Sequence, residues 1–275
     1  MYDFLVRNSV RSDIEYSQFK GIIDEGKSVT FYNWECPIRS YLRPGNSELE
    51  FVCEFVDSEE AIQKTRAISS IDLEKTFVDE VVRPLRETGM RVNYFKFLAD
   101  TNSELLYPET VNLEVKKKMF SFGRRLQTRM DEVVGSGVVT IMSFSQVLDM
   151  YRKEYMEVFN QVKYSFFMKC NDIPETRFMT MKKFRNELVQ LKDHAGVEGC
   201  DDRLLELGKR VVASYAAEEF VLRTKVANED WFKNPVAVPN ESMFTFPVMA
   251  NAYLGNKQRG PWLFVMYEGG KNGQL

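Results

Sequence analysis

The feature that most constrains the fold is the alternation of short strand-like runs with helical stretches along the first half of the chain. β-Branched and aromatic residues concentrate in runs that predict strands at 28–35, 92–98 and 138–142. Apolar residues at helical spacing predict helices between them, at 71–88 and 110–134. Strands that alternate with helices favour a parallel sheet with helices on both faces. We therefore expect an α/β fold.

The second half of the chain is predicted to be richer in helix. A loop rich in Pro and Asn (234–241) leads from its helical stretches to a final strand at 262–267. The first half holds two further predicted elements, a strand at 49–56 and a short helix at 58–67. Because no long linker, repeat or low-complexity segment interrupts the sequence, we expect one domain over 1–275. The helical stretches of the second half are 145–170, 178–192 and 201–227.

The composition indicates the environment of the protein. Hydrophobic residues make up 44% of the chain, which is enough for a full core. No apolar run approaches the roughly 20 residues that a membrane-spanning helix needs, and the first residues do not resemble a signal peptide. The four cysteines lie far apart, which favours free thiols in a reduced compartment over disulfides or zinc ligation. We therefore expect a cytoplasmic protein without membrane contact.

Histidine chemistry is restricted by the presence of a single histidine, His194. One histidine excludes most His-based metal sites and argues against a Ser-His-Asp triad. His194 lies in a polar stretch, which is typical of a surface loop. We expect neither a metal nor a cofactor.

The predicted helix 110–134 carries a basic face. Within 116–129 there is no acidic residue, although the whole chain has a net charge of −3. A local cluster of this kind suits a phosphate backbone, and the alternative is a merely solvated basic surface. The basic residues are Lys116, Lys117, Lys118, Arg124, Arg125 and Arg129.

Two weaker patterns suggest polar chemistry. Tyr215 and Glu219 are four residues apart and share a helix face, where a phenol beside a carboxylate can relay a proton. Such a pair also occurs by chance in many helices. Asp100 and Thr101 follow a predicted strand, at the edge where parallel sheets bind ligands. The alternative role of Asp100 or Thr101 is to cap a helix.

Taken in order, these features resemble the cyclodipeptide synthase family. A strand that ends in Asp100-Thr101 precedes the basic helix, and a short strand then leads into Ser143-Phe144-Ser145. A later helix carries Tyr-x-x-x-Glu, and a loop with Pro239-Asn240-Glu241-Ser242 runs into aromatic residues. The resemblance covers roughly residues 90–267 and rests on the order of the motifs, with few identical residues.

The resemblance implies a fold, an activity and a set of roles. The family has a Rossmann-like fold related to class I aminoacyl-tRNA synthetases. Its members take aminoacyl groups from two charged tRNAs and release a 2,5-diketopiperazine. Glu219 would then handle protons on the aminoacyl amine, while Tyr215 positions the amine or assists cyclisation. The basic face would hold the acceptor stem of the first aminoacyl-tRNA.

The chain departs from the family where the nucleophilic serine would follow the first strand. Here the strand ends in Trp34-Glu35-Cys36-Pro37, and an apparent insertion at about 36–70 follows. Cys36 is one alternative nucleophile, and Ser69 or Ser70 is the other. Both residues also have a purely structural alternative. Cys36 would be a small buried residue, and Ser70 would be the N-cap of a helix.

A second departure concerns the substrate pocket. Near Ser242 the family often has a Tyr-His pair, whereas this chain has Phe244-Thr245-Phe246-Pro247. The divergence resembles the fungal arginine-containing cyclodipeptide synthases, whose first substrate is arginyl-tRNA. An arginine side chain would need a buried carboxylate, for which Glu35, Asp100, Glu104 and Glu218 are alternatives. The pocket residues implied are Asn33, Glu35, Asp100, Thr101, Glu218, Ser242 and Phe246.

Two other functions compete with this prediction. A non-catalytic tRNA- or RNA-binding α/β protein would use the same basic helix 110–134. An unrelated α/β transferase would act on an anionic small molecule. The sequence contains neither GxGxxG nor GxxxxGK[ST], which disfavours the transferase.

Overall fold

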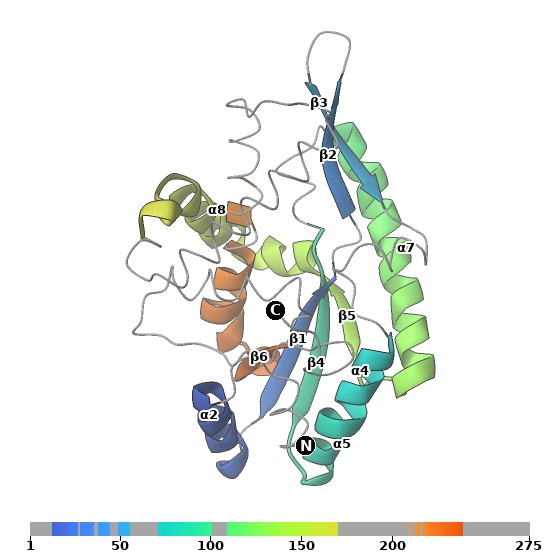
Figure 1. Ribbon diagram of the computed structural model, residues 1–275, viewed down its shortest axis with the longest axis vertical. Coiled ribbons are helices and arrows are strands. Elements are labelled where there is room, and N and C mark those ends of the chain that lie inside the picture. Colours follow the sequence, from blue (N-terminus) through green and yellow to red (C-terminus); the bar gives the residue numbers. More distant parts are fainter. Residues whose placement is uncertain are drawn as a thin grey trace.

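A parallel four-stranded sheet forms the centre of the molecule (Figure 1). In the computed structural model its strands lie in the order β5-β4-β1-β6, and every neighbouring pair is parallel. The prediction of an α/β fold with a parallel sheet is therefore confirmed. The strands are β1 (Val29–Glu35), β4 (Val92–Leu98), β5 (Thr140–Ser143) and β6 (Pro235–Ala237). The structure describes residues 13–26, 28–35, 38–44, 49–55, 71–100, 109–169, 210, 213–214 and 217–238.

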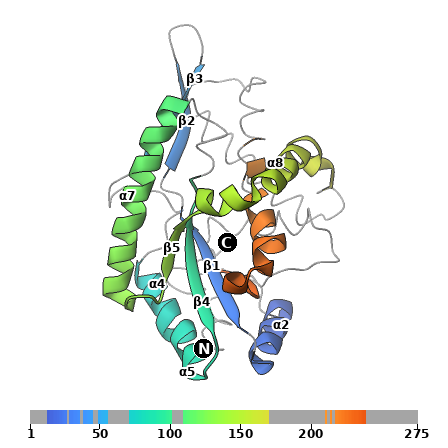
Figure 2. The same cartoon turned by 180° about the vertical axis from the view of Figure 1, so that it is seen from behind.

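Helices cover both faces of this sheet (Figures 1 and 2). One face packs against α4 (Ile71–Phe77), α5 (Arg83–Glu87) and α7 (Glu109–Val134). The other face packs against α8 (Phe144–Lys169) and the helical residues 217–224. Of the helices described, none combines the length and apolarity needed to cross a bilayer.

The prediction of helix 71–88 is confirmed, with a refinement in its middle. A π-helical segment, η1 (Val78–Val82), separates α4 from α5. Its buried Val78, Val81 and Val82 face the sheet. Helix α5 ends at Glu87, and Gly89 follows its cap residue Thr88 with a φ of 84°, which a residue without a Cβ atom readily adopts.

An antiparallel hairpin stands beyond the carboxyl edge of the sheet, beside the first turns of α7 (Figures 1 and 2). It consists of β2 (Ile38–Pro44) and β3 (Leu49–Phe55). The sequence analysis predicted β3 and missed β2. The hairpin lies within the range 36–70 for which an insertion is predicted.

Two other elements differ from expectation or were not foreseen. Residues 235–237 were expected in a loop, and this was wrong, because Val236 and Ala237 pair with β1 as the edge strand β6. The edge position explains why Pro235 is tolerated there. Helix α2 (Asp13–Asp24), whose Phe19 packs on Phe31 of β1, was not predicted. The 3₁₀ segments η3 (Val226–Asn228) and η4 (Asp230–Phe232) lead into β6. Predicted elements 58–67, 178–192 and 262–267 lie outside the described residues.

The face of the sheet toward α7 changes from apolar to polar along the strands. Val29 and Phe31 begin the buried face of β1, and Asn33 and Glu35 continue it at the carboxyl end. Lys96 of β4 lies beside them and is 1% exposed. The sequence therefore places buried charge at the edge of the sheet where α/β proteins bind ligands.

Candidate functional site

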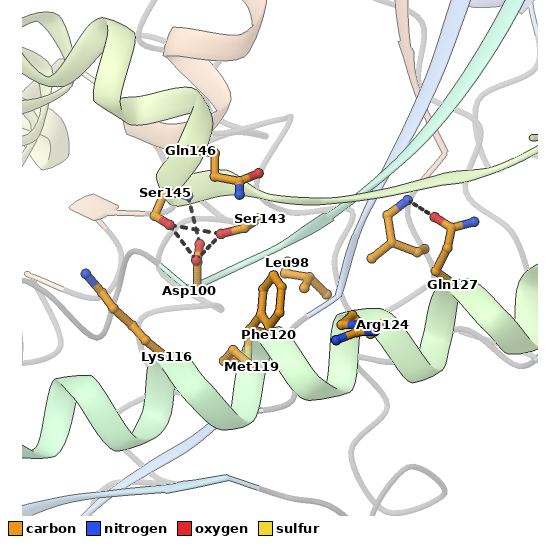
Figure 3. Close-up of a pocket in the computed structure, with 12 residues that line it drawn as sticks. Leu98, Asp100, Lys116, Met119, Phe120, Arg124, Gln127, Ser143, Ser145 and Gln146 are labelled. Carbon is orange, nitrogen blue, oxygen red and sulfur yellow. Dashed lines mark hydrogen bonds between the residues drawn. The ribbon is translucent and has the colours of Figure 1, made fainter.

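A cavity of about 390 Å³ lies between α7 and the carboxyl ends of β4 and β5 (Figure 3). Its size falls within the range of about 300–1,000 Å³ that is usual for small-molecule sites. Leu98, Met119 and Ile141 form apolar lining, and Asp100, Ser143 and Gln146 line it with polar groups. Helix α7 can lie close to the sheet because Gly123 has no side chain, and a Cβ atom there would lie 2.6 Å from Leu98 Cδ1.

Asp100 organises the polar end of this cavity. Its Oδ1 accepts a hydrogen bond from the backbone N–H of Ser145 at 2.9 Å, and its Oδ2 accepts one from Ser145 Oγ at 2.7 Å. Ser143 Oγ also donates to Asp100 Oδ2. Burial raises the pKa of Asp100, and the serine hydrogen bonds oppose that rise. Asp100 therefore accepts a hydrogen bond from a backbone N–H in the first turn of α8, although it lies outside that helix in the sequence.

Helix α7 forms the opposite wall of the cavity, which it lines with Lys116, Met119, Phe120, Gly123, Arg124 and Gln127. Lys117, Lys118, Arg124, Arg125 and Arg129 are exposed, and we call them the basic face of α7. Lys116 is half-buried, and it lines the cavity together with Arg124. Lys118 Nζ forms an ion pair with Glu114 at 2.9 Å. The predicted division of this helix into apolar and basic sides is confirmed, since Met119, Phe122 and Met130 are buried.

A buried ionic cluster lies on the same face of the sheet. Lys96 Nζ contacts the carboxylates of both Glu35 and Glu74. Tyr94 Oη donates to Glu74, and Asn33 Nδ2 donates to Glu74 Oε1 at 3.4 Å. The two carboxylates and one ammonium are each at most 4% exposed, so removing Lys96 would leave both buried carboxylates without a cation.

The pKa directions in this cluster follow from its charges. Burial lowers the pKa of Lys96, but the Glu35 and Glu74 carboxylates outweigh burial and hold the pKa above its ordinary value. Burial, and then the negative charge of Glu74, raise the pKa of Tyr94 well above its ordinary value. Lys96 is therefore charged and Tyr94 neutral throughout the physiological range.

Glu219 lies on the other face of the sheet, in a second buried network. Trp34 Nε1 donates to Glu219 Oε1 at 2.6 Å, and Tyr32 Oη donates to Oε2 at 2.8 Å. Arg223 Nε, one helical turn along, lies 3.2 Å from the same Oε2. Glu219 is fully buried and is not among the described residues that line the cavity.

This second network also shifts the pKa values of its members. Burial, and then the Glu219 carboxylate, raise the pKa of Tyr32. Burial lowers the pKa of Arg223, whereas Tyr32 and Glu219 outweigh it and raise the pKa overall. The network thus holds the charged guanidinium of Arg223 next to the neutral phenol of Tyr32.

The predicted site residues are distributed over three places. The cavity brings together Asp100, Lys116 and Arg124. Asn33 and Glu35 lie in the ionic cluster around Lys96. Glu218 and Glu219 are buried on the opposite face of the sheet. The predicted residues outside the described part of the chain are Cys36, Ser69, Ser70, Thr101, Glu104, Tyr215, Ser242 and Phe246.

The sequence analysis did not select Glu74, Tyr94 or Lys96. A signal was present for Lys96, because a lysine between Phe95 and Phe97 in an otherwise apolar strand needs a buried partner. No comparable signal marks Glu74, which comes from a separate helix. Arg223 was also detectable, because it follows Glu219 by four residues on one helix.

The arrangement combines positively charged groups with proton-exchanging groups. Asp100 borders the cavity, and burial raises the pKa of its carboxyl group. Ser143 and Ser145 supply hydroxyl groups beside it. Among the described residues, no group of three or more His, Cys, Asp or Glu is placed to hold a metal ion.

No protein-family model and no curated protein matches the chain. AlbC, a cyclodipeptide synthase from Streptomyces noursei, is a similar solved structure with 16% identity and a TM-score of 0.42, and the match covers 88% of this chain and 96% of AlbC. The PvcA protein from Pseudomonas aeruginosa has 10% identity and a TM-score of 0.48, over 97% of this chain and 82% of PvcA.

A third similar structure is the cyclodipeptide synthase from Candidatus Glomeribacter gigasporarum bound to Phe-tRNAPhe. It has 12% identity and a TM-score of 0.35, over 95% of this chain and 97% of that chain. Identities of 10–16% and TM-scores below 0.5 assign neither an activity nor a residue role to this protein.

Proposed function

We propose that the protein is a cyclodipeptide synthase, an aminoacyltransferase that joins aminoacyl groups from two aminoacyl-tRNAs and releases a 2,5-diketopiperazine. The observation that carries the proposal is the position of the basic face of α7. Arg124 of this face and the half-buried Lys116 line a cavity at the carboxyl edge of a parallel sheet. If the phosphate backbone of an aminoacyl-tRNA bound to α7, the aminoacylated 3′ end of the tRNA would lie near the cavity.

The chemistry required of the protein is modest. An aminoacyl ester is already activated, so the protein must supply orientation, a proton acceptor and a nucleophile. In this proposal Glu219 handles protons on the aminoacyl amine, and Tyr215 positions the amine or assists cyclisation. Cys36, Ser69 or Ser70 is the nucleophile. The motif order in the sequence supports these roles. Against them, Glu219 is buried on the face of the sheet opposite the cavity, and both of its oxygens already accept hydrogen bonds.

Arginyl-tRNA as the first substrate is the finer part of the proposal. It rests on the resemblance to the fungal arginine-containing branch. Two of the carboxylates considered for an arginine side chain already have polar partners, since Glu35 contacts Lys96 and Asp100 binds Ser143 and Ser145. The composition of the product tests this part directly.

One observation favours the second candidate, a tRNA-binding protein without catalysis. Both oxygens of Glu219 already accept hydrogen bonds from the core residues Tyr32 and Trp34. A carboxylate held in this way acts as a structural counter-ion for Arg223. Under this alternative, RNA binding would survive the loss of Tyr215 and Glu219.

The test is expression of the chain in a bacterial host, followed by mass spectrometry of the medium for diketopiperazines. We expect a product that is absent from a host carrying an empty vector, with arginine as one component. A matched variant with charge-neutral substitutions in the basic face of α7 should abolish the product while remaining folded. A soluble wild-type protein that yields no diketopiperazine would transfer the assignment to the non-catalytic RNA-binding protein.

A further inference from the structure

Phe120 is a large hydrophobic residue at an unusual position on α7. It is 60% exposed, although it belongs to a helix whose other aromatic residue, Phe122, is buried. Isolated exposed apolar residues are common on protein surfaces and by themselves indicate nothing. Phe120 differs because its side chain lines the cavity (Figure 3).

A basic residue lies on either side of Phe120 along α7. Lys116 precedes it by one helical turn and Arg124 follows it by one turn, so the three side chains share one side of α7. Figure 3 shows Phe120 between Lys116 and Arg124, directed across the cavity. The guanidinium carbon of Arg124 lies 6.0 Å from the centre of the Phe120 ring.

The far side of the cavity offers hydrogen-bonding groups opposite the ring. Ser143, Ser145 and Gln146 line it at the end of β5 and the start of α8. Gln146 is exposed, and its amide carries both donor and acceptor groups. An aromatic ring between two cations, facing donors and acceptors, matches a nucleotide that presents a flat base and a phosphate on each side.

We propose that Phe120 is the stacking platform for an unpaired nucleobase at the 3′ end of a bound RNA. Lys116 and Arg124 contact the phosphates that flank this base, and Gln146 contacts its edge. The inference rests on the proposed function for the identity of the RNA, because a charged tRNA presents an unpaired 3′ end. It assigns a binding role to an aromatic residue that the charge pattern alone does not include.

The test uses a hairpin RNA with an unpaired four-nucleotide 3′ tail that carries 2-aminopurine at its penultimate position, where a phosphate lies on each side of the base, and a blunt hairpin with the same stem. Stacking of a base on an aromatic side chain contributes enough that Phe120→Leu should weaken binding of the tailed hairpin by about 5- to 150-fold. Phe120→Tyr should retain binding and the quenching of 2-aminopurine fluorescence. Leu113→Ala is the matched control, because Leu113 is 59% exposed on the same helix and is not among the described residues lining the cavity.

Three results would overturn the inference. They are an unchanged affinity of Phe120→Leu for the tailed hairpin, an equal loss for the blunt hairpin, and no binding of the tailed hairpin by the wild-type chain. The salt dependence of binding distinguishes the contribution of the ring from that of the charges. Phe120→Leu should leave the slope of log affinity against log salt unchanged, and Arg124→Gln should reduce this slope.

The outcome is distinguishable from failure of the proposed function. If Phe120→Leu loses tail binding and the wild-type chain releases no diketopiperazine, the stacking role of Phe120 is supported and the proposed enzymatic activity is refuted. If the wild-type chain releases a diketopiperazine and Phe120→Leu binds the tail as the wild type does, only the stacking role of Phe120 is refuted.

Discussion

Replacing Glu219 with glutamine tests whether this residue is structural, catalytic or both. The amide keeps the volume of the side chain and one acceptor for Trp34 Nε1, which lies at 2.6 Å in the wild-type protein. It removes the negative charge opposite Arg223, whose side chain is 1% exposed. Removing one partner of a buried ion pair costs about 3–5 kcal/mol. Because one hydrogen bond is retained, we expect a loss of about 3 kcal/mol.

Chemical denaturation of the wild-type and variant proteins measures this loss. The matched control is the double variant Glu219→Gln/Arg223→Gln, which removes both charges from the network. The double variant should recover part of the stability lost in each single variant, with a coupling of about 1–3 kcal/mol. A loss below about 1 kcal/mol in Glu219→Gln would refute the view that the buried Arg223 depends on this carboxylate.

The same double variant separates stability from catalysis. If Glu219 handles a proton of the aminoacyl amine, the double variant should be folded, bind tRNA and release no diketopiperazine. If Glu219 is only a counter-ion, the double variant should regain activity along with stability. Activity near the wild-type level in the double variant would therefore remove Glu219 from the proposed mechanism.

Three further predictions follow from the other charged groups. Lys96→Met should lower the free energy of unfolding by about 3–5 kcal/mol, because it leaves two buried carboxylates without a cation, and a loss below about 1 kcal/mol in a denaturant titration would contradict this. Neutralising four residues of α7 should reduce the slope of log affinity for tRNA against log salt by about 3, since each phosphate contact contributes about 0.7–0.9, and an unchanged slope would exclude α7 from the RNA interface. Above pH 10 the unfolded chain releases the Tyr32 proton while the native state retains it, because burial and Glu219 raise the pKa of Tyr32, so stability should fall as the pH rises. Tyr32→Phe should make this alkaline fall shallower, and an identical pH profile in the variant would contradict the assigned direction of the pKa shift. The four residues of α7 are Lys117, Lys118, Arg124 and Arg125.

Elements with strong periodicity were predictable from the sequence. The strand 92–98 and the helix 110–134 agree with β4 and α7 to within one residue. Their patterns are unambiguous, because three of the seven residues of β4 are aromatic and α7 is interrupted by no proline. The basic face was predictable for the same reason, since charged residues off the apolar stripe of a helix point to solvent.

Short edge elements were not predictable. Strand β6 spans three residues, begins with Pro235 and exists because β1 offers an unpaired edge. Strand β2 alternates charged and apolar residues weakly, and its pairing with β3 is what defines it. In both cases the deciding interaction is with a strand elsewhere in the chain, which no local pattern encodes.

The sequence indicated a residue of the candidate site only where its position at the end of a strand was the evidence. Asp100 was identified because it ends a strand, and it does border the cavity. Glu219 was identified from a four-residue spacing, and the spacing did not indicate that Trp34 and Tyr32 surround it. Lys96 and Glu74 come together across 22 positions, which requires knowledge of how α4 packs on the sheet.

Transfer from charged tRNA in a purified system tests the central claim most directly. The wild-type protein would be incubated with isotopically labelled aminoacyl-tRNAs, and free diketopiperazine and remaining aminoacyl ester would be measured by mass spectrometry. We predict that labelled diketopiperazine appears as the ester disappears, and that neutralising the basic face of α7 slows both together. A wild-type protein that binds charged tRNA through α7 while the ester stays intact and no diketopiperazine forms would contradict the claim.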